Sequence, residues 1–121
     1  MVTTNSKVTN LAYLKELAKG DMNFINDMVT LFLEQTPDAI SKLEKSCSEK
    51  DWKTLRFVAH KMKPSFSFVG LNELSDKVNS VEEYSENEIH LNRLPEMIAD
   101  IKSVCSKAIE ELTEQKKEFQ V

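Results

Sequence analysis

The sequence predicts an all-α protein, an antiparallel four-helix bundle with a short extra helix at its N-terminal end. Only two glycines and three prolines occur among the 121 residues, so the chain is poor in turn formers. Apolar residues also recur at steps of three and four over several long stretches, which marks one face of a helix. Long helices with single apolar stripes and short connections are expected to pack as a bundle.

The length suits one compact domain, which we expect over residues 9–118, after a flexible N-terminal arm over residues 1–8. The first helix is predicted to begin after Asn10, its cap, and to end at Gly20. Its apolar face is formed by Leu11, Leu14 and either Leu17 or Ala18.

A second helix begins after Asp21, which is well placed to cap it, and residues 48–50 connect it to the next helix. Its predicted stripe comprises Phe24 or Ile25, Met28, Leu31 or Phe32, Ile40, Leu43 and Cys47. Pro37 cannot donate the helical hydrogen bond to Leu33, so we predict a kink or a local irregularity there. The apolar pattern resumes in register beyond Pro37, which argues against a helix end.

The third helix is predicted to begin after Asp51 and to run to about Phe68. Gly70 is expected to take the left-handed conformation that follows a last helical turn. The buried face of this helix should comprise Trp52, Leu55, Ala59, Met62, Phe66 and Val69.

The fourth helix is predicted to end near residues 84–85, before a polar loop over residues 85–88. Its inward residues are Leu71, Leu74, Val78 and Val81. A long last helix follows, with Pro95 in or near its first turn and a charged end, residues 114–121, that we expect to fray. Its stripe comprises Leu94, Ile98, Ile101, Cys105, Ala108 and Leu112.

His60 lies one step around the third helix from the buried stripe, so its imidazole is predicted to point outward or along a flank. Its neighbours at three or four residues' distance are Arg56, Phe57, Lys63 and Pro64. This setting leaves the ring accessible to a large partner and supplies a cation for an anion attached to it. Most single histidines on helices are ordinary surface residues, and His90, which lacks such surroundings, is assigned no role.

Residues 59–65 read Ala-His-Lys-Met-Lys-Pro-Ser and are followed by Gly70-Leu71. This run resembles the signature of the histidine-containing phosphotransfer (HPt) domains of two-component phosphorelays: Ala-His, any residue, Leu or Met, Lys, Gly, Ser and a later Gly. The Asp51-Trp52 pair and the run Phe-Leu-Glu-Gln-Thr-Pro at residues 32–37 are also similar to the family. The resemblance covers nearly the whole chain, from about residue 11 to residue 112.

Pro64 stands where the family most often has glycine. A proline inside a helix costs about 3 kcal/mol and tends to kink it, here beside His60, whose carbonyl loses its helical partner. Proline projects little beyond the backbone, so we interpret Pro64 as a variant of the pattern that preserves access to the imidazole.

The resemblance implies that His60 is a phosphoacceptor that attacks a receiver-domain aspartyl phosphate through Nε2 and passes the group to the aspartate of another receiver. Lys63 is the candidate to pair with the phosphoryl oxygens. No cofactor is expected in this chain, because the resemblance implies that the partner receiver brings the Mg²⁺. The expected protein is a phosphocarrier without catalytic activity of its own.

The expected partners are receiver domains of a hybrid histidine kinase, of a response regulator, or of both, bound by a monomer. Phe57, Pro64 and Phe68 continue an outward apolar strip beside His60, although Phe57 and Phe68 could equally pack against a neighbouring helix. The remaining candidate contacts to a receiver are Arg56, Lys61 and Ser67. Basic side chains here would complement an acidic receiver site and speed encounter.

Composition excludes other classes of protein. A formal net charge of −4 argues against general nucleic-acid binding. No run of eighteen apolar residues predicts a membrane span, and the polar residues 1–7 lack an apolar run of signal-peptide length. Cys47 and Cys105 fall on apolar helix positions, which favours reduced, buried thiols over a disulfide, and no Cys/His spacing suggests zinc. We therefore expect a soluble, cytoplasmic protein.

Two alternatives stay open from the residues alone. The chain could be a helical adaptor that binds a signalling partner through the His60 face without phosphate chemistry, although such an adaptor would not need both His60 and Lys63. It could instead hold an acid/base or metal site in the bundle core. That hypothesis requires inward carboxylates with Glu-x-x-His spacing, and no predicted stripe contains them.

Overall fold

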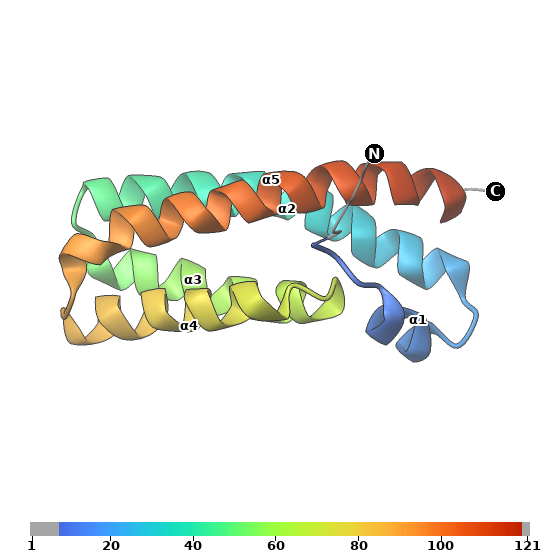
Figure 1. Ribbon diagram of the computed structural model, residues 1–121, viewed down its shortest axis with the longest axis horizontal. Helices are drawn as coiled ribbons and strands as arrows, with labels where there is room; N and C mark the ends of the chain where they lie inside the picture. The colour runs from blue at the N-terminus through green and yellow to red at the C-terminus, as the bar shows by residue number, and fades with distance from the viewer. Residues whose placement is uncertain (1–7, 120–121) are drawn as a thin grey trace, which may run out of the picture.

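The computed structural model describes residues 8–119, and the elements in this part of the chain are all helical. They are α1 (Ala12–Ala18), α2 (Met22–Ser48), α3 (Trp52–Phe68), α4 (Asn72–Asn87), the short 3₁₀ turn η1 (Leu91–Arg93) and α5 (Leu94–Phe119). The α2–α5 pair extends past the α3–α4 pair at one end, and the short α1 lies at that end (Figure 1). The predicted four-helix bundle with an extra N-terminal helix is confirmed.

The predicted stripes form one core. The residues in it that the sequence placed without alternatives are Leu11, Leu14, Ile40, Leu43, Leu55, Ala59, Met62, Phe66, Val69, Leu71, Leu74, Val78, Val81, Leu94, Ile98, Ile101, Cys105, Ala108 and Leu112. At three core positions the sequence left two adjacent residues as alternatives. The buried ones are Ala18, Ile25 and Phe32, while Leu17 and Leu31 are each 44% exposed. Burial of this one continuous apolar set is the main stabilising contribution to the bundle.

Some predicted core positions are only half-buried, namely Met28, Cys47 and Trp52. The sequence pattern also missed the buried residues Val29, Val58, Thr36, Ser46 and Ser85. The two serines are tolerated inside because each hydroxyl donates back to its own helix, Ser46 to the Lys42 carbonyl and Ser85 to the Val81 carbonyl, both at 2.7 Å.

The starts of α2 and α3 follow the predicted capping chemistry. The Asp21 carboxylate accepts a hydrogen bond from the Phe24 N–H at 3.1 Å, and Asp51 accepts one from the Thr54 N–H at 3.2 Å. The N-cap of α1 is Leu11 and not the predicted Asn10, whose side chain accepts from the Ala12 N–H at 2.9 Å from one residue farther back. α2 continues unbroken past Pro37, as the uninterrupted register of its stripe predicts.

Two predicted helix ends were too early. α4 runs to Asn87 instead of residues 84–85, because Ser85 is buried and the Asn87 side chain donates to the Glu83 carbonyl at 3.1 Å. α5 is helical to Phe119, although we expected fraying from residue 114. An ion pair of 3.0 Å between Lys117 and Glu114 lies within this last stretch.

The Glu111 carboxylate of α5 binds the N-terminal segment through several hydrogen bonds. Glu111 accepts hydrogen bonds from the Val8 N–H at 2.9 Å, the Thr9 N–H at 3.0 Å and the Thr9 hydroxyl at 2.6 Å. Partial burial alone would raise the pKa of Glu111, but these bonds outweigh it and lower that pKa below its ordinary value. Of the predicted flexible arm, residues 1–7 lie outside the described residues and Val8 is bound to the bundle.

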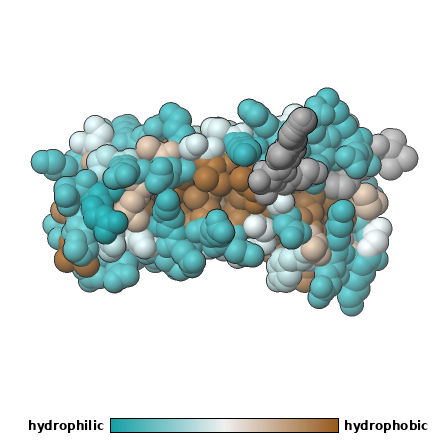
Figure 2. All heavy atoms as spheres, viewed as in Figure 1, coloured by the Kyte–Doolittle hydropathy of each residue, from teal (hydrophilic) through white to brown (hydrophobic). Residues whose placement is uncertain are grey.

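The helices leave some apolar atoms visible at the surface of the bundle (Figure 2). Figure 2 shows a mostly hydrophilic face on which apolar atoms are visible over the seam between α4 and α5.

Among the described residues, no helix is both long enough and apolar enough to cross a bilayer. Cys105 is buried and Cys47 is half-buried, both as free thiols, and burial raises the pKa of Cys105 to about 12.

Gly70, which follows α3 in the chain, packs closely against Asn10 in the segment before α1. Its φ of +78° is left-handed, as predicted, and the neighbouring Val69 carbonyl accepts from the Asn10 N–H at 2.9 Å. A Cβ at Gly70 would lie 2.7 Å from the Asn10 nitrogen and collide with the Asn10 carbonyl as well. Gly20 has a similar φ of +91°, but a Cβ there would meet nothing within 4 Å.

This contrast predicts different costs for two alanine substitutions. Gly70→Ala should lower the free energy of unfolding by about 2–4 kcal/mol, because it adds a backbone collision to left-handed strain. Gly20→Ala is the matched control and should cost about 1 kcal/mol, from strain alone. Urea unfolding of both variants measures the difference, and equal losses would contradict the close packing at Gly70.

Candidate functional site

His60 lies on the solvent side of α3, between the buried residue Ala59 and the exposed residue Lys61. Its side chain is 63% exposed, as expected for a ring next to the buried stripe rather than on it. The position follows from α3 itself, because a helix that buries Leu55, Ala59 and Met62 must turn His60 toward its edge.

The ring is held from the neighbouring helix by an acid that the sequence did not single out. The Nδ1 atom of His60 lies 2.9 Å from one oxygen of Glu82, on α4. The other oxygen of Glu82 receives the Lys63 ammonium at 2.6 Å, and that ammonium also donates to the Asn79 side chain at 3.0 Å. The site is therefore a small polar network that links α3 to α4.

The ionisation of Glu82 decides which ring nitrogen of His60 is free. Burial would raise the pKa of Glu82, but hydrogen bonds from Lys63 and His60, and their charges, lower it overall. An ionised carboxylate only accepts hydrogen bonds, so Nδ1 of His60 is the donor in this contact. Nε2 is then the ring nitrogen that is not engaged by Glu82, on a ring that is mostly exposed.

Pro64 is exposed, and α3 continues past it to Phe68. A hollow of about 340 Å³ lies at this point of the surface. Its lining is formed by His60, Lys63, Pro64, Ser67, Ser75 and Asn79. Access to the imidazole beside Pro64 is thus open, which is consistent with our interpretation of the substitution.

The two aromatic candidates for docking have different surroundings. Phe57 is 57% exposed, and the Lys61 ammonium lies 5.2 Å from the centre of its ring. Phe68 is half-buried and stacks on Tyr13 of α1, with 6.3 Å between ring centres and 22° between planes. Of the two alternatives left open for these residues, exposure holds for Phe57 and packing against another helix holds for Phe68.

The basic residues around His60 are only partly available. Arg56 pairs with Glu86 of α4 at 3.6 Å, in an exposed ion pair that water screens strongly. Lys63 is held by Glu82 and Asn79, whereas Lys61 extends over Phe57. Acidic and amide side chains of α4 therefore face the basic side of α3.

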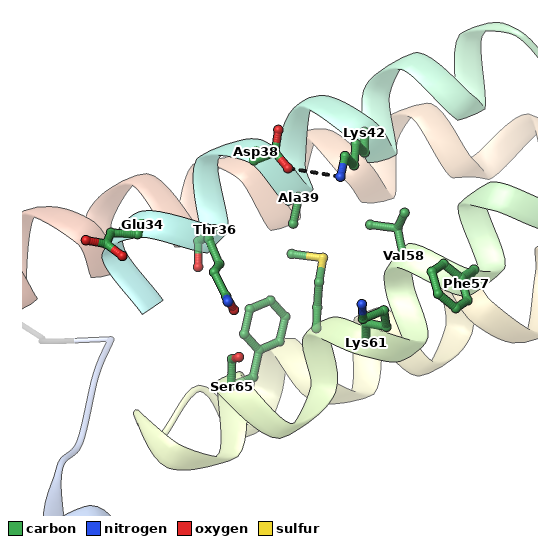
Figure 3. Close-up of a pocket in the computed structure, with 12 residues that line it drawn as sticks. Glu34, Thr36, Asp38, Ala39, Lys42, Phe57, Val58, Lys61 and Ser65 are labelled. Carbon is green, nitrogen blue, oxygen red and sulfur yellow. Dashed lines mark ion pairs between the residues drawn. The ribbon is translucent and has the colours of Figure 1, made fainter. Parts of the chain in front are cut away.

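A groove between α2 and α3 borders the part of α3 that carries Phe57 and Lys61 (Figure 3). Its volume is about 570 Å³, and Phe57 and Lys61 lie on its α3 side. Met62 and Phe66 contribute apolar lining, and an ion pair of 3.0 Å between Asp38 and Lys42 lies on the α2 side. Sequence periodicity did not predict this groove, because it depends on the distance between two helices.

The signal that could have identified Glu82 and Asn79 is their place on α4. Each directly follows an inward residue, Val81 and Val78 respectively, so both lie at the edge of the buried face. Their spacing of three puts them on the same side of that helix. Which helix they face could not be derived without the packing of α3 against α4.

The fold is similar to two solved structures. One is the histidine-containing phosphotransfer protein B (HptB) from Pseudomonas aeruginosa PAO1, with a TM-score of 0.80, 19% identity and coverage of 96% of each chain. The other is the HPT domain from the Hpt sensor hybrid histidine kinase from Shewanella, with a TM-score of 0.81, 14% identity and coverage of 95% of this chain and 98% of that chain. At these identities the likeness shows the fold alone. No curated protein shows a significant match.

A family model described as "Hpt domain" matches residues 27–116. The matched range includes α3 and α4, and with them His60, Lys63 and Glu82. Hpt domains are phosphotransfer carriers that work with histidine kinases and receiver domains. The resemblance seen at residues 59–65 is thereby confirmed: the chain belongs to the Hpt domain family, and its role is phosphotransfer in two-component signalling.

Proposed function

We propose that this chain is a phosphorelay intermediate: His60 accepts a phosphoryl group from the aspartate of one receiver domain and passes it to the aspartate of another. The observation that carries the proposal is the state of the His60 ring. The side chain is 63% exposed, and its Nδ1 is bonded to Glu82, which leaves Nε2 as the ring nitrogen available to a partner.

The chemistry needs a nucleophile that a folded partner can reach. The Nε2 lone pair of His60 attacks the phosphorus of an aspartyl phosphate, the new N–P bond forms, and the P–O bond to the aspartate breaks with release of its carboxylate. Transfer to the second receiver is the reverse of these events. We expect the receiver to contribute the Mg²⁺ that neutralises charge on the phosphoryl oxygens.

Lys63 is the residue of this chain that we propose to pair with the phosphoryl oxygens. Its ammonium shares the Glu82 carboxylate with the His60 ring, so it is close to the reacting side chain. In the unphosphorylated protein it is bonded to Glu82 and Asn79. A phosphoryl group on Nε2 would compete for this flexible ammonium, which suits a group that must be bound and then released.

The receiver is proposed to dock on the exposed face of α3 around His60. Phe57 and Pro64 supply exposed apolar contacts, and the Phe68–Tyr13 stack extends this surface to α1. The polar contacts proposed around them are Arg56, Lys61 and Ser67. A cationic edge beside an apolar centre fits the acidic phosphorylation site of a receiver.

The direct test is transfer of labelled phosphate from a phosphorylated receiver with Mg²⁺. The parent protein should gain label that is acid-labile and base-stable, whereas His60→Gln should gain none. His90→Gln is the matched control, because it removes the other histidine of the chain, and it should be labelled like the parent. Label on His60→Gln would contradict His60 as the acceptor, whereas a parent that binds receivers and takes no label from any of them would favour a helical adaptor.

A second test concerns docking through Phe57. Phe57→Ala should weaken receiver binding about tenfold while leaving the transfer rate at saturating receiver nearly unchanged, because the ring contacts the partner and not the phosphoryl group. Met22→Ala is the control, since Met22 is also exposed, at 39%, but lies at the start of α2. Equal affinities of the two variants would exclude Phe57 from the docking surface.

A further inference from the structure

The seam between α3 and α4 carries carboxylates at the His60 ring and on one side of it. Glu82 bonds Nδ1 of the ring at 2.9 Å. One helical turn farther along α4, Glu86 pairs with Arg56 at 3.6 Å. The oxygens of a phosphoryl group on Nε2 carry negative charge, so like-charge repulsion disfavours turning them toward this side of the seam.

The other side of the ring opens into a hollow that is rich in hydrogen-bond donors. Its volume is about 340 Å³, and among the described residues those that line it include no carboxylate. The lining comprises His60, Lys63, Pro64, Ser67, Ser75 and Asn79. Besides the ring, its polar groups are an ammonium, an amide and two hydroxyls, all of which can donate to an oxyanion.

The orientation of the Asn79 amide follows from its contact with Lys63. An ammonium only donates hydrogen bonds, so the atom that lies 3.0 Å from the Lys63 nitrogen is the amide oxygen Oδ1. The other end of the amide is the nitrogen Nδ2, and within the described part of the chain no hydrogen bond engages it. Asn79 is exposed, so these N–H groups are open to a ligand in the hollow.

We propose that this hollow is the oxyanion site for the phosphoryl group on His60, and that Nδ2 of Asn79 donates a hydrogen bond to a phosphoryl oxygen there. The inference rests on the proposed function and adds a second donor to Lys63. An amide accepts from the Lys63 ammonium through Oδ1 and donates to the anion through Nδ2 at the same time. Asn79 therefore keeps the ammonium beside the hollow while it binds the phosphoryl group itself.

Donation from Asn79 changes the balance between the two carriers of the phosphoryl group. It stabilises phosphohistidine only once the N–P bond has formed, so it shifts the equilibrium of transfer from the receiver aspartate toward His60. A neutral amide binds an anion more weakly than a second cation would, so the group is still released to the next receiver.

The first experiment needs no receiver. In a His90→Gln background, phosphoramidate transfers its phosphoryl group to the His60 ring and releases ammonia, and ¹⁵N NMR follows the side-chain amides. The Nδ2 signals of Asn79, assigned by their loss in Asn79→Ala, should shift on phosphorylation, with one proton moving downfield. The amide signals of Asn72, at the start of α4, are the control and should stay in place. Unchanged Asn79 signals would overturn the proposal.

The second experiment separates donation by Asn79 from mere placement of Lys63. It measures the equilibrium of transfer between a phosphorylated receiver and the parent, Asn79→Ala or Asn79→Asp. Asn79→Asp keeps an acceptor for the Lys63 ammonium, but it removes the N–H groups and adds negative charge to the hollow. It should shift the equilibrium toward the receiver about 100-fold, whereas Asn79→Ala should shift it about tenfold. Asn72→Asp adds the same charge to α4 away from the hollow and should behave like the parent.

The order of the two Asn79 variants decides between the two roles. If Asn79 only holds Lys63 in place, Asn79→Asp would perform at least as well as the parent and better than Asn79→Ala, and that order would reject donation to the phosphoryl group. A parent that phosphoramidate labels but that exchanges phosphate with no receiver would instead reject the relay, while the amide signals would still decide the role of Asn79. Circular dichroism of each variant verifies that the bundle is folded.

Discussion

Burial of one apolar stripe of α3 determines where the His60 ring lies. Leu55, Ala59, Met62 and Phe66 are all buried, and a helix has only one orientation that buries all four. That orientation puts His60 at the edge of the buried face, next to α4 and open to solvent. The hydrophobic core thus positions the site, and the polar network between α3 and α4 orients its ring.

Pro64 shows what this arrangement tolerates. The proline removes the helical partner of the His60 carbonyl, a change that costs about 3 kcal/mol in a helix interior. α3 nevertheless continues to Phe68, because Met62 and Phe66 on either side of Pro64 are held in the core. The proline itself is exposed and lines the same hollow as the His60 ring.

Periodicity and capping chemistry predict the helices well because both act within one segment. The starts of α2 and α3 at Asp21 and Asp51 are examples, since each carboxylate bonds an N–H three residues ahead. Contacts between segments could not be predicted in the same way. Phe57 and Phe68 occupy similar positions on α3, yet only Phe68 is stacked on a side chain of another helix, because α1 brings Tyr13 to it. Glu82 escaped prediction for the same reason, since its meaning depends on how α4 lies against α3.

Because Nδ1 of His60 is bonded to Glu82, we propose that Nε2 alone is the phosphoryl acceptor. The most direct measurement is the one-bond coupling between ³¹P and ¹⁵N in the phosphorylated protein labelled with ¹⁵N at its histidines. We expect coupling from phosphorus to Nε2 of His60, with hydrogen retained on Nδ1. Phosphorus bonded to Nδ1, or to another residue, would contradict it.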